Sequence, residues 1–283
     1  MKKISMAEML SAAEKNNCAL AAINASNFET INAVLAAADR CNAPVILQFS
    51  PLQRTAEDIS YGEITELAEL LSRRYEHGAY VIHQDHGGSF EDCTEALEGK
   101  FTSIMYDGAA LSYEENIANS ARVRALGDDF FLESELGVLG AECSEQTGEM
   151  DDEAYTRAEL VPEFVKRTGC NSLAVSIGNA HGIYKREPKL RFDILDKIHA
   201  VFSVPLVLHG ASGIPYDDVR TAISKGIRKI NFFTQLDRAF MAAFREEADK
   251  GSYMMFAQRA GFDAMTEKAQ ELIELCTGGK IKC

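Results

Sequence analysis

Long hydrophobic runs are absent from this chain of 283 residues. No apolar stretch approaches the roughly 18 residues that a membrane-spanning helix needs. The N-terminal residues Met1-Lys2-Lys3-Ile4 lead into an amphipathic pattern, not into the apolar core of a signal peptide. The sequence therefore predicts a protein that is not exported and has no membrane partner.

Cysteine motifs and basic charge are also scarce. The seven cysteines are odd in number and scattered, and none is spaced as CxxC, which argues against a disulfide framework and a cysteine-only zinc site. The 29 Lys and Arg stand against 43 Asp and Glu, for a net charge of -14, so broad electrostatic capture of nucleic acid is not expected. We expect a cytoplasmic protein with no nucleic-acid partner, which binds any anionic substrate through local groups.

The chain does contain a repeated alternation of β-branched runs and helical patterns, which is typical of parallel strands joined by crossover helices. The predicted strands are Ala19–Asn24, Val45–Phe49, Tyr80–His83, Ser103–Asp107, Phe130–Leu136, Ser172–Ile177, Pro205–His209 and Lys229–Phe232. The predicted helices are Phe28–Arg40, Tyr61–Glu76, Phe90–Glu98, Tyr113–Leu126, Ala158–Thr168, Phe192–Val201, Tyr216–Ser224 and Gln235–Lys250, followed by one more at about Ala257–Leu275. Eight such units predict an α/β fold, a (β/α)8 TIM barrel with an additional C-terminal helix, as a single domain over residues 1–283.

Polar residues recur at or just beyond the carboxyl ends of the predicted strands. They are Asn24, Gln48, Ser50, Asp85, His86, Asp107, Glu133, Glu135, His181, His209 and Asn231. The chemistry of a (β/α)8 barrel lies at that end of its strands. A doubly wound open sheet is the competing fold, but it gives no reason for polar residues after almost every strand.

The stretch from His83 to Gly87 is the first candidate for an active-site edge, because buried carboxylates and imidazoles are costly unless they are paired or bind a metal. His86, His181 and His209 each follow a predicted strand and each precede a glycine. Three neutral imidazoles with an open position are an arrangement used by catalytic zinc. His83 is a possible fourth ligand, but strand alternation puts it on the face opposite His86, so the local turn decides which side chains reach the site.

Two segments at the last two predicted strands, the first of them rich in glycine, indicate phosphate binding. The segments HGASGIP at His209–Pro215 and KINFFT at Lys229–Thr234 each follow a strand and open a helix. Backbone N–H groups in such loops bind phosphate, and barrels often place a phosphate after strands seven and eight. An ordinary glycine turn is the alternative for either loop alone.

Several linked motifs carry a family resemblance. They are AIN ending at Asn24, INAVL at Ile31–Leu35, PVILQFS at Pro44–Ser50, the pair Asp85-His86, MYDG at Met105–Gly108, ELG at Glu135–Gly137, HGIY at His181–Tyr184, HGASGIP and KIN. In their order and spacing, from about Ala19 to Met265, the chain resembles the class II, zinc-dependent ketose-bisphosphate aldolases, the fructose-bisphosphate and tagatose-bisphosphate aldolases. The resemblance implies reversible cleavage of a ketose 1,6-bisphosphate or ketose 1-phosphate to dihydroxyacetone phosphate and an aldehyde.

The resemblance also implies roles for individual residues. His86, His181 and His209 would bind Zn2+, with Glu135 near an alternative metal position, and Asp85 would exchange a proton with the aldehyde oxygen. Asn231 would hold the ketone-derived fragment, whose phosphate would lie among Gly182, Gly210, Ser212 and Thr234, often with a monovalent cation (Na+ or K+) nearby. Asn24, Gln48, Ser50 and Asp107 would be supporting polar groups.

Two departures from the family pattern concern the loop after the fifth predicted strand and the distal end of the substrate. Family members usually read ELGxxGGxE, and an ungapped match puts Cys143 at the final glutamate, with Glu142 and Glu145 as the available replacements. We favour Glu142 as the second catalytic residue, although both glutamates could simply belong to an acidic surface loop.

At the distal end, Arg259 is the counterpart of an arginine that reaches the second phosphate in relatives, sometimes from a neighbouring subunit. Pro51–Arg54 stand where the family commonly has a small, glycine-containing loop, so we expect a loop here too, and Phe233 stands where relatives often have a small or acidic residue. The alternatives left open are an aldolase for a modified sugar phosphate without a distal phosphate, a barrel metallohydrolase and a non-catalytic sugar-phosphate binding protein. The extra C-terminal helix predicts a homodimer or homotetramer.

Overall fold

Parallel strands close into a barrel in the computed structural model, which describes residues 1–138, 154–182, 184, 187–201 and 203–283. The strands are β1 (Lys2–Lys3), β2 (Leu20–Asn24), β3 (Pro44–Phe49), β4 (Ala79–Gly87), β5 (Ser103–Tyr106), β6 (Phe131–Leu136), β7 (Ser172–Val175), β8 (Leu206–Leu208) and β9 (Ile227–Phe232). β2 to β9 pair in sequence order, and the β2–β9 pairing closes the ring, while β1 adds to the start of β4. The predicted (β/α)8 barrel is confirmed.

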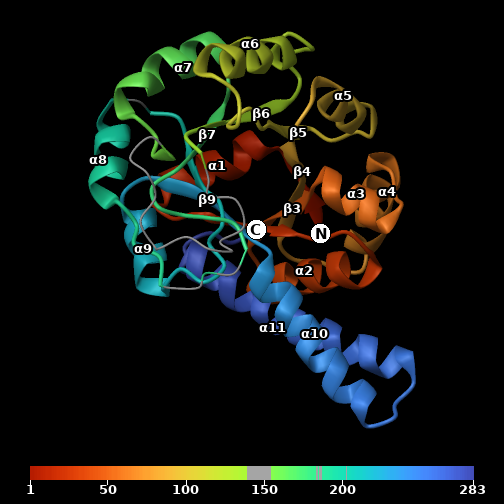
Figure 1. Cartoon of the computed structure of the whole chain (residues 1–283). Coiled ribbons are helices and arrows are strands. Elements are labelled where there is room, and N and C mark those ends of the chain that lie inside the picture. Colours follow the sequence, from red (N-terminus) through yellow and green to blue (C-terminus); the bar gives the residue numbers. More distant parts are fainter. Residues whose placement is uncertain (139–153, 183, 185–186, 202) are drawn as a thin grey trace.

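Helices surround this barrel (Figure 1). They are α1 (Met6–Lys15), α2 (Phe28–Cys41), α3 (Pro51–Glu57), α4 (Tyr61–Ser72), α5 (Phe90–Glu98), α6 (Tyr113–Arg124), the 3-10 turn η2 (Ala158–Leu160), α7 (Val161–Thr168), α8 (Phe192–Val201), α9 (Tyr216–Ser224), α10 (Thr234–Asp249) and α11 (Met254–Thr277). None of the helices in the described ranges is both long enough and apolar enough to cross a bilayer.

Helix α3 differs from the loop expected at residues 51–54. Ser50 caps its N-terminus by accepting a hydrogen bond from the Gln53 backbone N–H, and the Gln53 side chain reaches back to the Ser50 backbone. Pro51 occupies the first turn, where its missing N–H costs nothing. The sequence Ser-Pro-Leu-Gln therefore contained a capping box that specifies a helix.

The barrel interior has an apolar floor with charged side chains above it. Because strand side chains alternate between two faces, Leu20, Ala22, Ile46 and Val81 point inward and pack against α1 residues such as Met9. Further along the same strands the inward positions become polar. Helix α1 thus closes the amino end of the barrel with apolar contacts and leaves polar groups for the carboxyl end.

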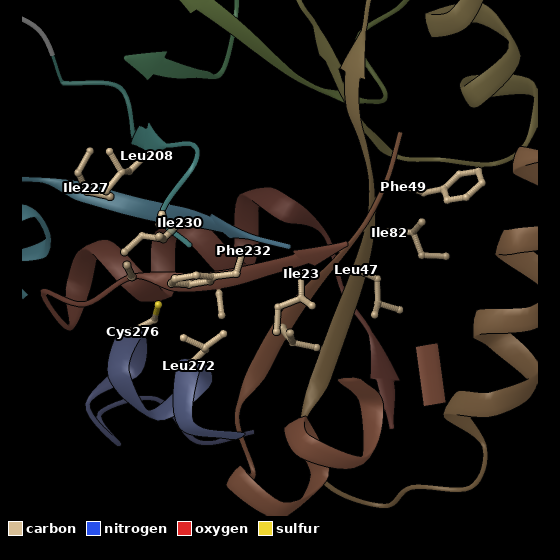
Figure 2. Close-up of a cluster of buried hydrophobic side chains, with 14 of the residues drawn as sticks. Ile23, Leu47, Phe49, Ile82, Leu208, Ile227, Ile230, Phe232, Leu272 and Cys276 are labelled. Atoms are coloured by element: carbon tan, nitrogen blue, oxygen red, sulfur yellow. The ribbon is translucent and has the colours of Figure 1, made fainter. Parts of the chain in front are cut away.

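The outer core lies between the strands and the helices (Figure 2). Leu272 and Cys276 of α11 lie close to Ile230 and Phe232 of β9 in this view, and all four side chains are buried. In α10, by contrast, only Leu236 is buried, and α10 extends away from the barrel alongside the first half of α11 (Figure 1). The second half of α11 therefore supplies the cover that a helix directly after β9 was expected to provide.

Candidate metal and substrate site

Three histidines converge at the carboxyl end of the barrel. His86 Nε2 lies 3.2 Å from His181 Nε2 and 3.0 Å from His209 Nδ1, and the three ligand atoms all lie within 4.8 Å of one another. A tetrahedral zinc with bonds of about 2.0–2.1 Å separates its ligand nitrogens by about 3.4 Å. The spacing of these nitrogens is close to what one shared metal requires.

A backbone irregularity brings His86 into this group. Regular alternation along β4 would turn Asp85 and His86 to opposite faces. The pairing of β4 with β5 shifts register between Gln84 and Gly87, and His86 has a left-handed φ of 52°. The local turn thus directs the imidazole of His86 into the same cavity as the Asp85 carboxylate, whose Oδ1 is 3.8 Å from His86 Nε2.

Carboxylates fix the tautomers of two of the three histidines. His86 Nδ1 lies 2.7 Å from Asp107 Oδ2, and His209 Nε2 lies 2.9 Å from Glu133 Oε1. Because an ionised carboxylate only accepts hydrogen bonds, each of these ring nitrogens carries the proton. The other nitrogen of each ring points toward the shared centre and is the atom that would bind a metal.

Asp85 is held by two amides. Its Oδ2 accepts a hydrogen bond of 2.9 Å from Asn24, and its Oδ1 accepts one of 3.1 Å from Asn231. Burial would raise the pKa of Asp85, but the charges of His86, His209 and Lys229 and the bond from Asn24 outweigh burial and lower it. Asp85 is therefore an ionised carboxylate, oriented toward the cavity and able to accept a proton.

Glu135 is a buried carboxylate that lacks a full set of partners. Its Oε2 has no hydrogen-bond partner among the described residues, and burial, together with the charge of Asp107, raises its pKa well above the usual value. One ligand atom each of His86, Asp107 and Glu135 forms a second group that could hold a cation. An orphaned buried oxygen next to a histidine cluster fits a site that binds a metal.

The electrostatics of the histidines are unequal. Burial and the neighbouring His86 lower the pKa of His181 to about 4, and burial lowers that of His209 further below its usual value. Burial opposes protonation of His86 too, but Asp85 and the hydrogen bond to Asp107 raise its pKa to about 10. The negative surroundings that favour a proton on His86 favour a metal cation there as well.

A cavity of about 950 Å³ lies beside these groups and is lined by His86 and His181, while His209 is buried behind them. It contains Asn24, Ser50, Asp85, His86, Asp107, Glu135, His181, Gly182, Gly210, Ser212, Asn231 and Thr234 among the residues predicted from the sequence. Gln48 lies behind Asn24 and donates a 3.2 Å hydrogen bond to its Oδ1. Glu142, predicted as the second catalytic residue, lies outside the described residues, as do Cys143 and Glu145.

One side of the cavity combines tightly packed backbone with the N-terminus of a helix. Gly210 has a φ of +63°, and a Cβ there would lie 2.1 Å from the Ala180 carbonyl oxygen. Ser212 Oγ accepts a hydrogen bond from the Phe233 N–H, just before α10 begins at Thr234. The first N–H groups of a helix have no partner within the helix and attract negative charge, so this side offers donors to a phosphate.

Another part of the cavity lining is apolar. Leu52, Val138 and Phe233 line it and are 78%, 46% and 48% exposed. Arg54 points away toward α5, where its guanidinium pairs with Glu95. Arg259 forms an ion pair with Asp263 on α11 and does not line the cavity of this chain.

No role was predicted from the sequence for Glu133 or Lys229, which lie beneath the histidines, and His83 was considered only as a fourth metal ligand. Glu133, Lys229 and His83 are completely buried and hydrogen-bonded to one another, and His83 contacts Ser103 instead of joining the metal group. The signal was present, because His83 and Asp85, Glu133 and Glu135, and Lys229 and Asn231 are pairs two residues apart on strands. Such pairs share the inward face.

The chain is similar to several known proteins in sequence and fold. A sequence model of the family described as fructose-bisphosphate aldolase class-II matches residues 4–279. The uncharacterized protein YdjI of Escherichia coli (strain K12) is 36% identical over 269 residues, which are 93% of each chain. Among solved structures, the YdjI aldolase from Escherichia coli K12 has a TM-score of 0.84 at 34% identity over 97% of both chains. A fructose-bisphosphate aldolase from Campylobacter jejuni has a TM-score of 0.80 at 25% identity, over 97% of this chain and 95% of that chain.

Proposed function

The chain belongs to the class II fructose-bisphosphate aldolase family, and from this membership we propose that it is a zinc-dependent aldolase releasing dihydroxyacetone phosphate and an aldehyde from a ketose phosphate. The family and the aldolase lyase class predicted from the sequence are confirmed. The choice of zinc, the substrate and the residue roles are our proposal.

One observation carries the proposal: an ionised carboxylate lies beside a three-histidine cluster. Asp85 Oδ1 is 3.8 Å from His86 Nε2, the same nitrogen that faces His181 and His209. A substrate that placed its ketone carbonyl at the metal would have the hydroxyl of its β-carbon within reach of a base. Both groups are needed to break the bond between the α- and β-carbons.

The residues divide the proposed reaction among them. His86, His181 and His209 would hold the metal, with Glu135 and Asp107 offering a second position, and a divalent cation such as Zn2+ supplies Lewis-acid polarisation of a carbonyl. Asp85 accepts the proton of the hydroxyl on the carbon that becomes the aldehyde. As that C–O bond becomes a carbonyl, the carbon–carbon bond breaks and its electron pair stays with the ketone fragment. Asn231 orients Asp85 through Nδ2 and keeps Oδ1 without a partner among the described residues, available for the ketone fragment.

A second carboxylate is needed to return a proton to the carbon of the ketone fragment. We assign this role to Glu142, and Glu142→Ala should slow exchange of that carbon-bound proton with solvent while leaving the zinc content unchanged. Proton exchange at the normal rate in this variant would remove Glu142 from the mechanism. Glu145→Ala is the matched control, because it removes a carboxylate three residues away.

The phosphate of the ketone fragment would lie among Gly182, Gly210, Ser212 and Thr234, with Na+ or K+ as a possible companion cation. The N-terminus of α10, which lies beside Ser212, supports this placement. In this proposal the phosphate end is bound mainly by backbone donors, in keeping with the scarcity of basic residues in the chain.

Two candidate substrate classes differ in whether the distal end of the sugar carries a second phosphate. Fructose and tagatose 1,6-bisphosphates are the leading substrates by family. An aldolase for a sugar phosphate without a distal phosphate is the second candidate, and a specific observation favours it. Among the residues whose positions are described, the cavity is lined by no Lys or Arg, and Arg54 and Arg259 both pair with carboxylates outside it.

Incubation of the zinc-loaded protein with dihydroxyacetone phosphate and a panel of aldehydes tests both levels of the proposal. Carbon–carbon bond formation that is lost on chelation and restored by Zn2+ supports the aldolase. Faster reaction with glyceraldehyde 3-phosphate than with glyceraldehyde supports the bisphosphate substrates, and the reverse supports the second candidate. Hydrolysis of sugar phosphates without any carbon–carbon chemistry would contradict the proposal and favour a metallohydrolase.

A further inference from the structure

A buried network of ionisable side chains runs through the barrel interior beneath the three histidines. His209 Nε2 lies 2.9 Å from Glu133 Oε1, and Glu133 Oε2 lies 2.8 Å from Lys229 Nζ. Lys229 Nζ lies 3.2 Å from His83 Nε2, and His83 Nδ1 lies 2.8 Å from Ser103 Oγ. This buried network therefore crosses the barrel from the end of β8 through β6 and β9 to β4 and β5.

These groups cannot take part in the chemistry directly. His209, Glu133, Lys229, His83 and Ser103 are each 0% exposed, and of the five none lines the cavity. A substrate in the cavity has no path to Glu133 or Lys229. Any influence of these two residues on the site has to pass through His209.

The donors and acceptors of the buried network decide which ring nitrogen of His209 carries the proton. Lys229 only donates and Glu133 only accepts in their charged forms, so their contacts at 2.8 and 3.0 Å are an ion pair. The same carboxylate faces His209 Nε2, which must therefore carry a hydrogen. This leaves the lone pair on His209 Nδ1, the atom 3.0 Å from His86 Nε2 in the ligand group.

Charge balance explains why Lys229 is part of the buried network. A buried carboxylate without a counter-charge carries a large desolvation penalty, and so does a buried ammonium. His83 turns a lone pair toward Lys229 and donates from Nδ1 to Ser103, and burial and Lys229 hold its pKa well below the usual value. Glu133, Lys229 and His83 thus contribute one negative group, one positive group and one neutral imidazole to the buried network.

We propose that Glu133 and Lys229 are positioning residues: Glu133 holds His209 in the tautomer that presents Nδ1 to a divalent metal, and Lys229 balances the charge of Glu133. The inference rests on the proposed metal site but concerns residues that the reaction itself does not use. Carboxylate partners of metal-binding histidines commonly change metal affinity about 10- to 100-fold. Glu133 should affect metal affinity within that range, and Lys229 should mainly affect folding stability.

The pair can be separated with three variants, Glu133→Gln, Lys229→Met and the double variant. A glutamine at 133 keeps the size of the side chain but can either accept from or donate to His209, so it no longer dictates the tautomer. Each single variant leaves one buried charge unpaired, whereas the double variant removes both. We therefore expect the double variant to have a higher Tm than either single variant, while its metal affinity stays reduced.

The measurement is the Kd for Zn2+ by competition with a chromophoric chelator, with the Tm of the metal-free protein recorded in parallel. Lys225→Met is the matched control, because Lys225 pairs with Asp196 away from the barrel interior. Expected results are a Kd raised about 10- to 100-fold in Glu133→Gln and in the double variant, with the control unchanged. A folded Glu133→Gln protein with the wild-type Kd would overturn the inference, and so would a double variant that regains wild-type affinity together with its Tm.

The same measurement separates this inference from the proposed function. A wild-type protein that fails to bind one divalent metal with its histidines would contradict the metal site itself. A wild-type protein that binds the metal, combined with Glu133→Gln binding equally well, contradicts only the role of Glu133. If the single variants do not fold, the double variant alone decides the question through its Kd.

Discussion

Two parts of the cavity lining differ in how they are built. At the ends of β2, β4 and β9, buried polar groups hold one another at fixed distances, as Asp85 does with Asn24 and Asn231. On the neighbouring helix α3, the exposed apolar side chain of Leu52 faces the opening. Buried hydrogen-bonded groups tolerate little change, because an unpaired partner is costly, whereas exposed apolar residues can be replaced at little cost. The polar part fits the reaction step, and the apolar part fits a changeable substrate preference.

Removal of the metal should have the largest effect, since it disables the polar part entirely. We expect chelation to abolish aldol cleavage and Zn2+ to restore it. Binding should weaken as the pH falls, because His86, whose pKa is raised to about 10, must lose a proton when a metal binds. Titration of the apparent Kd between pH 6 and 9 measures this, and an affinity that is independent of pH would contradict it.

Asp85→Ala should have the next largest effect. Loss of a general base typically costs about 10²- to 10⁴-fold in rate, so kcat should fall within that range. Because Asp85 is not one of the proposed metal ligands, the variant should still bind zinc. Steady-state kinetics and metal analysis of the same sample check both points, and a variant that keeps wild-type kcat would exclude Asp85 as the base.

Gly210→Ala should produce an intermediate effect on the phosphate side. The added Cβ meets the Ala180 carbonyl oxygen at 2.1 Å, and φ is +63°, so we expect a loss of stability of about 1–3 kcal/mol and weaker binding of dihydroxyacetone phosphate. Gly251→Ala is the control, since Gly251 has a φ of +79° and nothing within 4 Å of the added atom. Equal effects of the two substitutions would show that backbone strain alone is responsible.

Leu52→Arg should have the smallest effect on the reaction but should sharpen the contrast between the two parts. A cation at this exposed position should favour glyceraldehyde 3-phosphate over glyceraldehyde by up to about fivefold in kcat/KM, since an exposed ion pair contributes about 0–1 kcal/mol. Arg54→Ala is the control, because Arg54 already pairs with Glu95 outside the cavity. An unchanged ratio of the two aldehydes would place the distal group elsewhere.

The sequence predicted the barrel because the alternation of strand and helix patterns is a local property of the chain. It also located the polar residues after each strand, and His86, His181 and His209 do converge. The predictions were weaker for the start of a short helix and for which helix packs on which strand. Helix α3 was taken for a loop despite its capping box, and the cover over β9 comes from α11 because of packing that no local pattern reveals.

What the sequence by itself determined is therefore the order of the elements and the residue types available at the carboxyl ends of the strands. The tertiary structure decided which of these groups touch. The left-handed backbone at His86 turns its ring toward the other histidines, and closure of the barrel brings Glu133 and Lys229, 96 positions apart in the chain, to within 2.8 Å. Residue patterns report the face on which a side chain lies, but only the closed sheet sets the distances on which proton and metal chemistry depend.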